Sequence, residues 1–291
     1  MCKTAIRSLL PVVFLIATGL AQSANDASTT CTFRKFQIPN TYATFVYGIN
    51  NKGAIVGTYN PNSGSQFGYV WQAGVVSDYV YPGAAFTNAY GMSDTGAVVG
   101  SYQVTLFGSQ QGFVWRNGKY AQITYPGSLA TYAYGVNVHG QIVGSYQDSL
   151  GISHGFSYFG GTYTVIDYPG AADTFVTGIN NNGVMAGGYT DTSNVGHGFL
   201  DENGAFTVID YPGGANNNVS VVNDNKVVVG SFYNSSYSQY EGFVWNNGTF
   251  TKISDPADPA HTAVTGINNN LIVAGNVDNS GSGFTASGCA N

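Results

Sequence analysis

The chain has 291 residues, including 40 Gly, 21 Tyr and 17 Phe, and only 8% of its residues are charged while 43% are hydrophobic. Few charges and many aromatic residues exclude an intrinsically disordered chain, and scarce Glu and Lys exclude a long coiled coil. The formal charge of −6 offers no basic surface for nucleic acid, so nucleic acid is not an expected partner. Frequent Gly, Asn, Thr, Tyr and Val favour strands joined by tight turns.

Residues 1–21 have the pattern of a secretory signal peptide, with two cations before an apolar run over residues 9–17 and small residues before Gln22. The run is too short to cross a bilayer as a helix. We therefore expect a secreted protein, extracellular or periplasmic, with no membrane span. Residues 22–30 predict a disordered lead-in, and residues 31–291 predict a single domain.

One motif recurs along the rest of the chain. The segment Tyr-Gly-Ile-Asn at 47–50 and its five later copies have their second position at residues 48, 91, 135, 178, 221 and 266, which are steps of 43, 44, 43, 43 and 45 residues. A period of about 40–45 residues is that of a four-stranded propeller blade. The spacing predicts an all-β fold, a six-bladed β-propeller with four antiparallel strands in each blade.

The first repeat contains four strand-like segments, at 44–50, 54–59, 67–71 and 75–81. Short Asn- and Gly-containing turns join the first strand to the second. The fourth strand ends in Tyr-Pro-Gly in four copies, where proline interrupts no ladder bond. An asparagine ends the first strand in most copies, as Asn50 does. We interpret it as an Asx-type turn residue rather than as part of a ring of ligands.

The repeat pattern G-[IV]-N-x-x-G-x-[IV]-V-G-x-Y is followed by His-Gly-Phe at 154–156 and 197–199. It resembles the extracellular HAF-repeat family over residues 32 to 287. The family is named for a His-Ala-Phe triplet at this point; here Gly replaces the Ala, and two of the six copies have His. The resemblance implies an exported repeat protein and assigns no reaction and no site residue.

The chain begins and ends inside a repeat. Residues 33–39 match a fourth strand without its blade, and residues 282–287 match a third strand without a fourth. We expect the N-terminal strand to complete the last blade, because a closed ring leaves no exposed sheet edge. An open solenoid, the alternative, would not need complementary half-repeats at its two ends.

The same alignment predicts a disulfide bond. Cys2 leaves with the signal peptide, so the mature chain has two cysteines, Cys31 and Cys289. Each aligns with Gly118, at the turn between the third and fourth strands of an intact blade. Residues that flank such a turn lie about 5–6 Å apart at Cα, within disulfide range. We predict that Cys31 and Cys289 are bonded and lock the ring.

The long, variable connections between second and third strands lie on one face of the ring, together with the links between blades. The opposite face consists of short turns, and we predict a structural role for it. Variable loops on a rigid scaffold commonly bind ligands. Near the channel mouth on this face, most repeats place an aromatic or amide side chain. These side chains could bind sugar rings; the alternative is that they pack one blade against the next. These candidates are Phe45, Asn88, Tyr132, Phe175 and Asn218.

His154 and His197 occupy another shared column on the long-loop face and are further candidates for ligand binding. A metal site needs three or four converging donors, which a column spread round a ring does not provide. We therefore expect no metal and no cofactor.

Three functions stay open. The favoured one is a non-catalytic, monomeric binding module for an extracellular glycan or protein. The second is a carbohydrate-active hydrolase or lyase, whose two carboxylates would come from Asp173, Asp191, Glu202 and Glu241. The third is a structural envelope or matrix protein. Neither a Gly-x-Ser-x-Gly motif nor a cysteine with a histidine partner marks a nucleophile.

Overall fold

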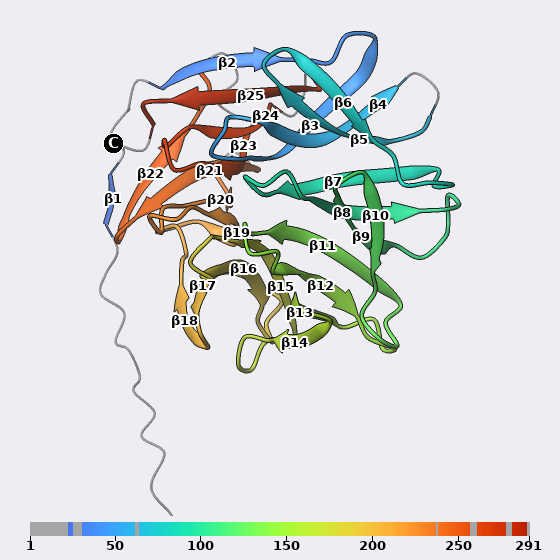
Figure 1. The fold of residues 1–291 in the computed structure, drawn as a ribbon. Helices are drawn as coiled ribbons and strands as arrows, with labels where there is room; N and C mark the ends of the chain where they lie inside the picture. The colour runs from blue at the N-terminus through green and yellow to red at the C-terminus, as the bar shows by residue number, and fades with distance from the viewer. Residues whose placement is uncertain are drawn as a thin grey trace, which may run out of the picture.

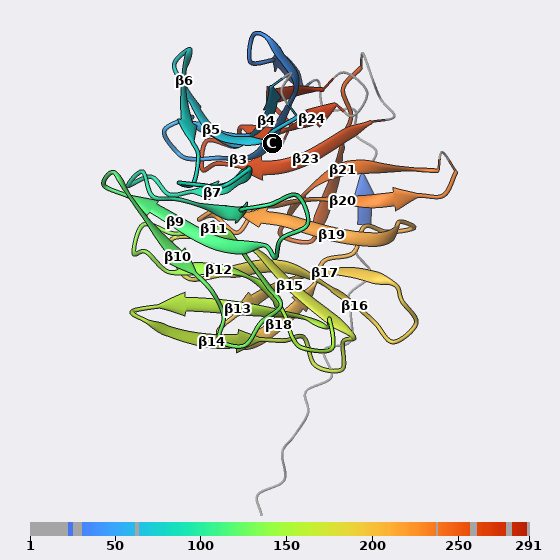
Figure 2. The ribbon, with the colours of Figure 1, turned by 90° about the vertical axis from the view of Figure 1, so that its right-hand side faces the viewer.

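The structure is a computed structural model that describes residues 23–25, 31–61, 64–236, 238–256, 261–277 and 281–289. In these ranges the regular elements are all strands, grouped into six sheets that follow one another round a ring (Figure 1; Figure 2). The ring confirms the predicted six-bladed β-propeller. The expected signal peptide, residues 1–21, lies outside the described residues.

Blades 1 to 5 are antiparallel meanders of four consecutive strands. Blade 1 has β3 (Thr41–Ile49), β4 (Ile55–Pro61), β5 (Phe67–Gln72) and β6 (Val75–Tyr79). Blade 2 has β7 (Phe86–Met92), β8 (Val98–Gln103), β9 (Gln111–Arg116) and β10 (Lys119–Ile123). Blade 3 has β11 (Ala130–Val136), β12 (Ile142–Gln147), β13 (Ser153–Phe159) and β14 (Thr162–Ile166). Blade 4 has β15 (Asp173–Ile179), β16 (Met185–Thr190), β17 (Gly196–Glu202) and β18 (Ala205–Val208). Blade 5 has β19 (Ala215–Val222), β20 (Val228–Asn234), β21 (Gln239–Asn246) and β22 (Thr249–Ile253).

Blade 6 is built from both ends of the chain. It contains β23 (Thr262–Ile267), β24 (Val273–Val277) and β25 (Ser282–Ser287), and its fourth strand is the N-terminal β2 (Thr32–Phe36), antiparallel to β25. The predicted closure is confirmed. A further short strand, β1 (Ser23–Asn25), falls within the predicted lead-in and pairs in parallel with β22 of blade 5.

Each blade packs a buried aromatic ring of its third strand over a glycine of its second strand. A Cβ atom at Gly100 would lie 2.9 Å from the ring of Phe113 and would collide with the carbonyl group of Asn88. Phe113 is fully buried. Since no larger residue fits in this space, the glycine allows the ring to fill the core. The equivalent pairs are Gly57 with Tyr69, Gly144 with Phe156, Gly187 with Phe199, Gly230 with Phe243 and Gly275 with Phe284.

The Tyr-Pro-Gly segments join neighbouring blades through stacked rings. Tyr81, at the end of blade 1, stacks on Tyr102 of blade 2 with ring centroids 3.6 Å apart and planes 5° apart. Its backbone N–H donates to Thr87 Oγ1 of blade 2 at 3.1 Å. Three later links repeat the stack: Tyr125 on Tyr146, Tyr168 on Tyr189 and Tyr211 on Phe232. The motif that marks a strand end in the sequence therefore also fastens one blade to the next.

The asparagine that ends the first strand has two roles. Asn180 Oδ1 accepts hydrogen bonds from the backbone N–H groups of Asn182 at 3.0 Å and Val184 at 2.9 Å, which confirms the Asx-type turn. Its Nδ2 group donates to the Asn223 carbonyl of the next blade at 2.9 Å. Each such amide therefore shapes its own turn and binds the adjacent blade.

These interblade amide bonds run almost completely round the ring. The donor and acceptor pairs are Asn50 to Ser93, Asn137 to Asn180, Asn180 to Asn223, Asn223 to Asn268, and Asn268 to Asn50. The last of these joins blade 6 to blade 1. Blade 2 has Ser93 in this position, and serine has no amide to donate. We call these residues the amide ring.

Cys31 and Cys289 form the predicted disulfide, with their Cα atoms 4.9 Å apart and a sequence separation of 258. Cys289 is fully buried in a core cluster that includes Val273 and Phe284. The bond joins the ends of β2 and β25 where the other blades have a covalent turn.

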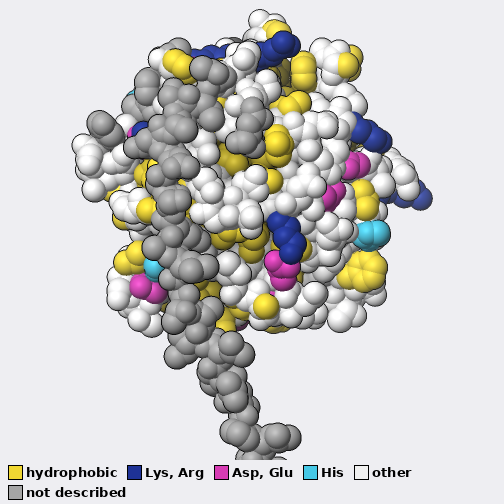
Figure 3. Space-filling view, turned by 90° about the vertical axis from the view of Figure 1, so that its left-hand side faces the viewer, with side chains coloured by type: hydrophobic (Ala, Val, Ile, Leu, Met, Phe, Trp, Pro, Cys, Tyr) yellow, Lys and Arg dark blue, Asp and Glu magenta, His cyan; other side chains and the backbone are white. Residues whose placement is uncertain are grey.

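Charged side chains are sparse on the outside of the ring. On the side shown in Figure 3, small groups of charged side chains lie within a larger area of hydrophobic and uncharged ones, in keeping with a chain that is 8% charged.

Loss of the disulfide should lower the stability of the ring. For a 258-residue loop the chain-entropy model gives about 5 kcal/mol, which we take as an upper limit because β2 and β25 still pair. Denaturant unfolding of the Cys31→Ala/Cys289→Ala variant should show a lower midpoint than the oxidised protein. Equal midpoints would contradict the closing role of this bond.

Loss of one member of the amide ring should also be costly. Asn180→Ala removes three hydrogen bonds, so we expect a loss of about 3 kcal/mol in the free energy of unfolding, at about 1 kcal/mol each. Asn270→Ala, at an exposed turn position, should change it by less than about 0.5 kcal/mol. Ser93→Asn, which supplies the missing amide, should be stabilising. Thermal unfolding that does not distinguish the two alanine variants would refute the role of the amide ring.

Candidate ligand-binding site

A small cavity lies in the central channel. This cavity of about 80 Å³ is lined by Tyr47, Tyr90 and Tyr134 on one half and by Thr and Ser side chains on the other. The Tyr90 ring lies 5.2 Å from that of Tyr47 and 5.1 Å from that of Tyr134. Burial raises the pKa of Tyr134 to about 12.

The residues predicted at the channel mouth lie in different environments. Asn88 is buried, and its Oδ1 atom accepts a hydrogen bond from Thr58 of the preceding blade at 3.2 Å. Tyr132 lies parallel to Tyr134 at 5.8 Å. Phe45 and Phe175 are half-buried, and Asn218 is exposed. Their role in ligand binding stays a prediction.

The two predicted histidines lie in neighbouring blades, each between two carboxylates of its own blade. In blade 3, His154 Nδ1 is 2.8 Å from Asp167 Oδ2, and its Nε2 is 3.7 Å from Asp148 Oδ2. The corresponding distances from His197 in blade 4 are 2.6 Å to Asp210 and 3.6 Å to Asp191. Within the described residues, no group of three or more His, Cys, Asp or Glu is arranged to hold a metal ion.

The contacts of Asp167 and Asp210 with the histidines were not predicted from the sequence. The sequence did contain an indication of these contacts. The two repeats that have His also have Asp at the same two positions, Asp148 and Asp167 in one repeat and Asp191 and Asp210 in the other. The loop carboxylates also order their own turns. Asp191 Oδ1 accepts from the backbone N–H groups of Val195 at 2.9 Å and Ser193 at 2.8 Å. The Val195 bond leads the effects that lower the pKa of Asp191.

The carboxylates considered for hydrolysis each have a separate partner. Glu241 is buried and accepts from Lys252 Nζ at 2.8 Å, whereas Glu202 pairs with Lys226 at 2.6 Å. Asp173 accepts from the backbone N–H of Ser153 at 2.8 Å. None of the contacts described for these carboxylates joins two of them into a catalytic pair.

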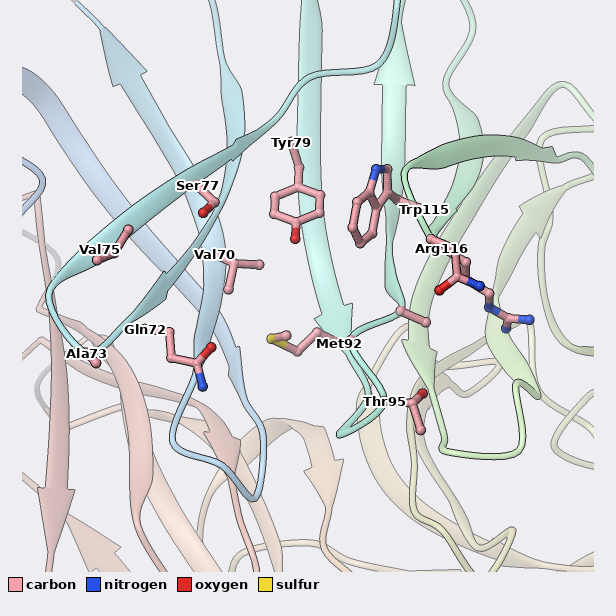
Figure 4. A pocket seen from close by; sticks show the side chains of 13 residues that line it. Val70, Gln72, Ala73, Val75, Ser77, Tyr79, Met92, Thr95, Trp115 and Arg116 are labelled. Atoms are coloured by element: carbon pink, nitrogen blue, oxygen red, sulfur yellow. The ribbon is translucent and has the colours of Figure 1, made fainter.

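A groove of about 820 Å³ lies between blades 1 and 2, at the end of the blades where the short turns lie. The aromatic rings of Tyr79 and Trp115 meet edge to face at 4.9 Å on its wall, with Met92 close to them (Figure 4). Gln72, Ser77 and Thr95 add amide and hydroxyl groups. The alternation of β6 turns Val75, Ser77 and Tyr79 to the same side, toward blade 2.

The groove lies at a contact between blades that brings two aromatic rings together, Tyr79 and Trp115. Ile123, Ile166, Ile209 and Ile253 stand in the position of Tyr79 in the next four blades. At the contact of blade 6 with blade 1, Phe36 and Trp71 stack at 5.7 Å with planes 19° apart. Comparing the repeat positions that face each other across neighbouring blades could have indicated this groove. The short-turn face was instead predicted to be structural.

The groove is lined by no carboxylate. Its one charged side chain, Arg116, points away from the Tyr79 and Trp115 rings (Figure 4), and its Nη2 atom donates to the Gly140 carbonyl of blade 3 at 3.0 Å. The surface that remains is aromatic, apolar and neutral polar. A second hollow, of about 570 Å³, lies on the long-loop side of the same two blades and includes Tyr42 and Phe86.

No protein-family model and no curated protein matches this chain. Among solved structures, TolB from Acinetobacter baumannii is similar with a TM-score of 0.55 and 9% identity, over 85% of this chain and 64% of that chain. A fucose-specific lectin from Aleuria aurantia has a TM-score of 0.51 and 10% identity, over 83% of this chain and 91% of that chain. At these identities the likeness shows a shared fold.

Acid should release the Asp191 turn. Because the folded pKa of Asp191 is lowered, its contribution is complete above about pH 4, the ordinary aspartate value, and is lost as the pH falls through the folded pKa. The amide shifts of Ser193 and Val195 in an NMR titration should therefore move with an apparent pKa below that value. Asp191→Asn should abolish this transition. A transition at the ordinary value would show that the turn bonds do not hold the carboxylate.

Proposed function

We propose that this chain is an exported β-propeller of the HAF-repeat family that binds a neutral carbohydrate without transforming it, and that the groove between blades 1 and 2 is its binding site. The observation that supports this most strongly is the pairing of Trp115 with Tyr79 beside neutral polar groups. Apolar faces of sugar rings pack against aromatic rings, while their hydroxyl groups need amides and hydroxyls as partners.

The dimensions and chemistry of the groove suit such a ligand. Its 820 Å³ falls within the roughly 300–1,000 Å³ typical of small-molecule sites. The Tyr79 phenol is protonated at neutral pH and can donate a hydrogen bond, and burial raises its pKa further above the ordinary value. Gln72, Ser77 and Thr95 offer further donors and acceptors. Because glycoside hydrolysis uses a pair of carboxylates and none lines the groove, we favour binding over catalysis here.

Two further observations support the proposal. The Cys31–Cys289 bond is of a kind that persists in oxidising compartments, which fits export. Among the described residues, no helix has the length and hydropathy needed to cross a bilayer. The fold similarity to a fucose-specific lectin from Aleuria aurantia is compatible with sugar binding; for this chain, the support comes from its own groove.

A glycan array probed with the chain from Gln22 onward tests the proposal. We expect binding to neutral glycans, and Trp115→Ala should weaken it at least about tenfold, or 1.4 kcal/mol. Trp245→Ala is the matched control, because Trp245 has the same repeat position in blade 5 but packs near Ile209. The glycan affinity of this control variant should stay within about twofold of that of the unmodified protein.

Mass spectrometry of the retained glycans should show no cleavage. Binding that survives Trp115→Ala but is lost in Tyr132→Ala or Phe175→Ala would place the site at the channel mouth instead. Absence of any glycan binding, with both proteins folded by circular dichroism, would overturn the proposed function.

A further inference from the structure

Large apolar side chains are exposed at the loop tips of blades 2 and 3, on the face opposite the groove. Phe107 is 94% exposed, Leu150 81%, Leu106 62% and Val104 61%. Leu129, in the link between these blades, is also exposed. We call these five residues the loop-tip patch. Scattered apolar side chains are ordinary on a surface, but a concentration of large ones marks an interaction site.

Backbone hydrogen bonds join the loops that form this patch. The Thr131 N–H of blade 3 donates to the Gln110 carbonyl of the blade 2 loop at 3.0 Å. Leu129 N–H donates to the Gln147 carbonyl at 2.8 Å, at the start of the blade 3 loop. The link between blades 2 and 3 is therefore bonded to both loops, which places the two loops on either side of Leu129.

The loops also hold their apolar side chains outward. Asp148 Oδ1 accepts from the N–H groups of Leu150 at 2.8 Å and Ile152 at 2.9 Å, which orders the turn that presents Leu150. In the blade 2 loop, the Gln103 amide donates to the Gly108 carbonyl beside Phe107. Because polar bonds order these turns without covering the apolar groups, exposure is a property of the folded loops.

The formal charge around the patch is negative. The connections on this face from blade 2 to blade 4 contain four aspartates, two histidines, which are formally neutral at pH 7, and no Lys or Arg. These aspartates are Asp148, Asp167, Asp173 and Asp191, and the connections are residues 103–111, 126–132, 147–154, 167–175 and 190–197. Asp148 lies in the same turn as Leu150. A partner that covers the apolar side chains therefore meets negative charge beside them.

We propose that the loop-tip patch docks a basic, amphipathic polypeptide segment, whose apolar side chains cover Phe107, Leu106 and Leu150 and whose Lys or Arg side chains face the aspartates. Charge complementarity of this kind selects the partner and speeds the encounter. The same carboxylates disfavour an anionic membrane surface, which attracts basic rather than acidic proteins. The inference does not depend on the sugar site, because the two sites lie at opposite ends of the blades.

A pair of synthetic helical peptides provides the test. One has 18 residues of leucine and lysine arranged as an amphipathic helix, and the other has glutamate in place of each lysine. The full-length mature protein should bind the Leu/Lys peptide at least about tenfold more tightly than the Leu/Glu peptide. Added salt should weaken the binding, because the charges are exposed.

Three variants locate the site. Leu106→Ser/Phe107→Ser/Leu150→Ser should raise the Kd for the Leu/Lys peptide at least about tenfold, and Asp148→Asn/Asp191→Asn about threefold or more. The control is Phe159→Ser, which removes a 57% exposed aromatic side chain at the other end of blade 3. It should leave the Kd within about twofold. Since all the mutated apolar groups are exposed, unfolding midpoints should be unchanged and confirm that each variant folds.

Equal affinity for the two peptides, or an unchanged Kd in the triple serine variant, would overturn the proposal. Co-sedimentation with phosphatidylcholine vesicles that depends on Phe107 and Leu150 would do the same, in favour of a neutral bilayer. Trp115→Ala should retain peptide binding, so a failure here is distinct from a failure of the sugar site.

Discussion

The contact between neighbouring blades is the constraint on which the rest of this propeller depends. A single blade exposes both faces of its sheet, so it is stable only when each face packs against the next blade. Here each blade packs an aromatic ring over one of its own glycines, and polar bonds cross the contacts between blades. At the short-turn end the amide ring supplies such bonds at every contact except that between blades 2 and 3. At the Tyr-Pro-Gly links the backbone N–H of the tyrosine donates to a side-chain oxygen of the next blade. Closure by β2 and the disulfide makes this arrangement continuous.

The same regularity explains where function can arise. The glycine–aromatic pairs and the amide ring vary little between blades. The residues near the outer edge of the contacts between blades, and those in the loops, differ more. Tyr79 faces Trp115 where later blades have isoleucine, and this exchange accompanies an open groove. The paired Asp and His side chains of blades 3 and 4 are another local departure. Asymmetry in a repeated fold thus marks the candidate sites.

Much of the architecture could be predicted from the sequence, because it depends on spacing along the chain. The even period, the complementary ends and the alignment of Cys31 and Cys289 with Gly118 specify six blades, closure and the disulfide. The groove and the carboxylate partners of the histidines could not be read in the same way. They depend on which side chains of separate strands face one another across or within a blade. Only a comparison of facing columns, such as Tyr79 with Trp115, approaches that information.

We propose that sugar binding resides at one contact between blades of an otherwise uniform ring. A crystal structure of the protein with a glycan that it retains on the array is the most direct test. We expect density for a single sugar ring against Trp115, between blades 1 and 2, with its hydroxyl groups toward Gln72 or Thr95. Density at the channel mouth beside Phe45 and Tyr132, or in every seam of the ring, would contradict it.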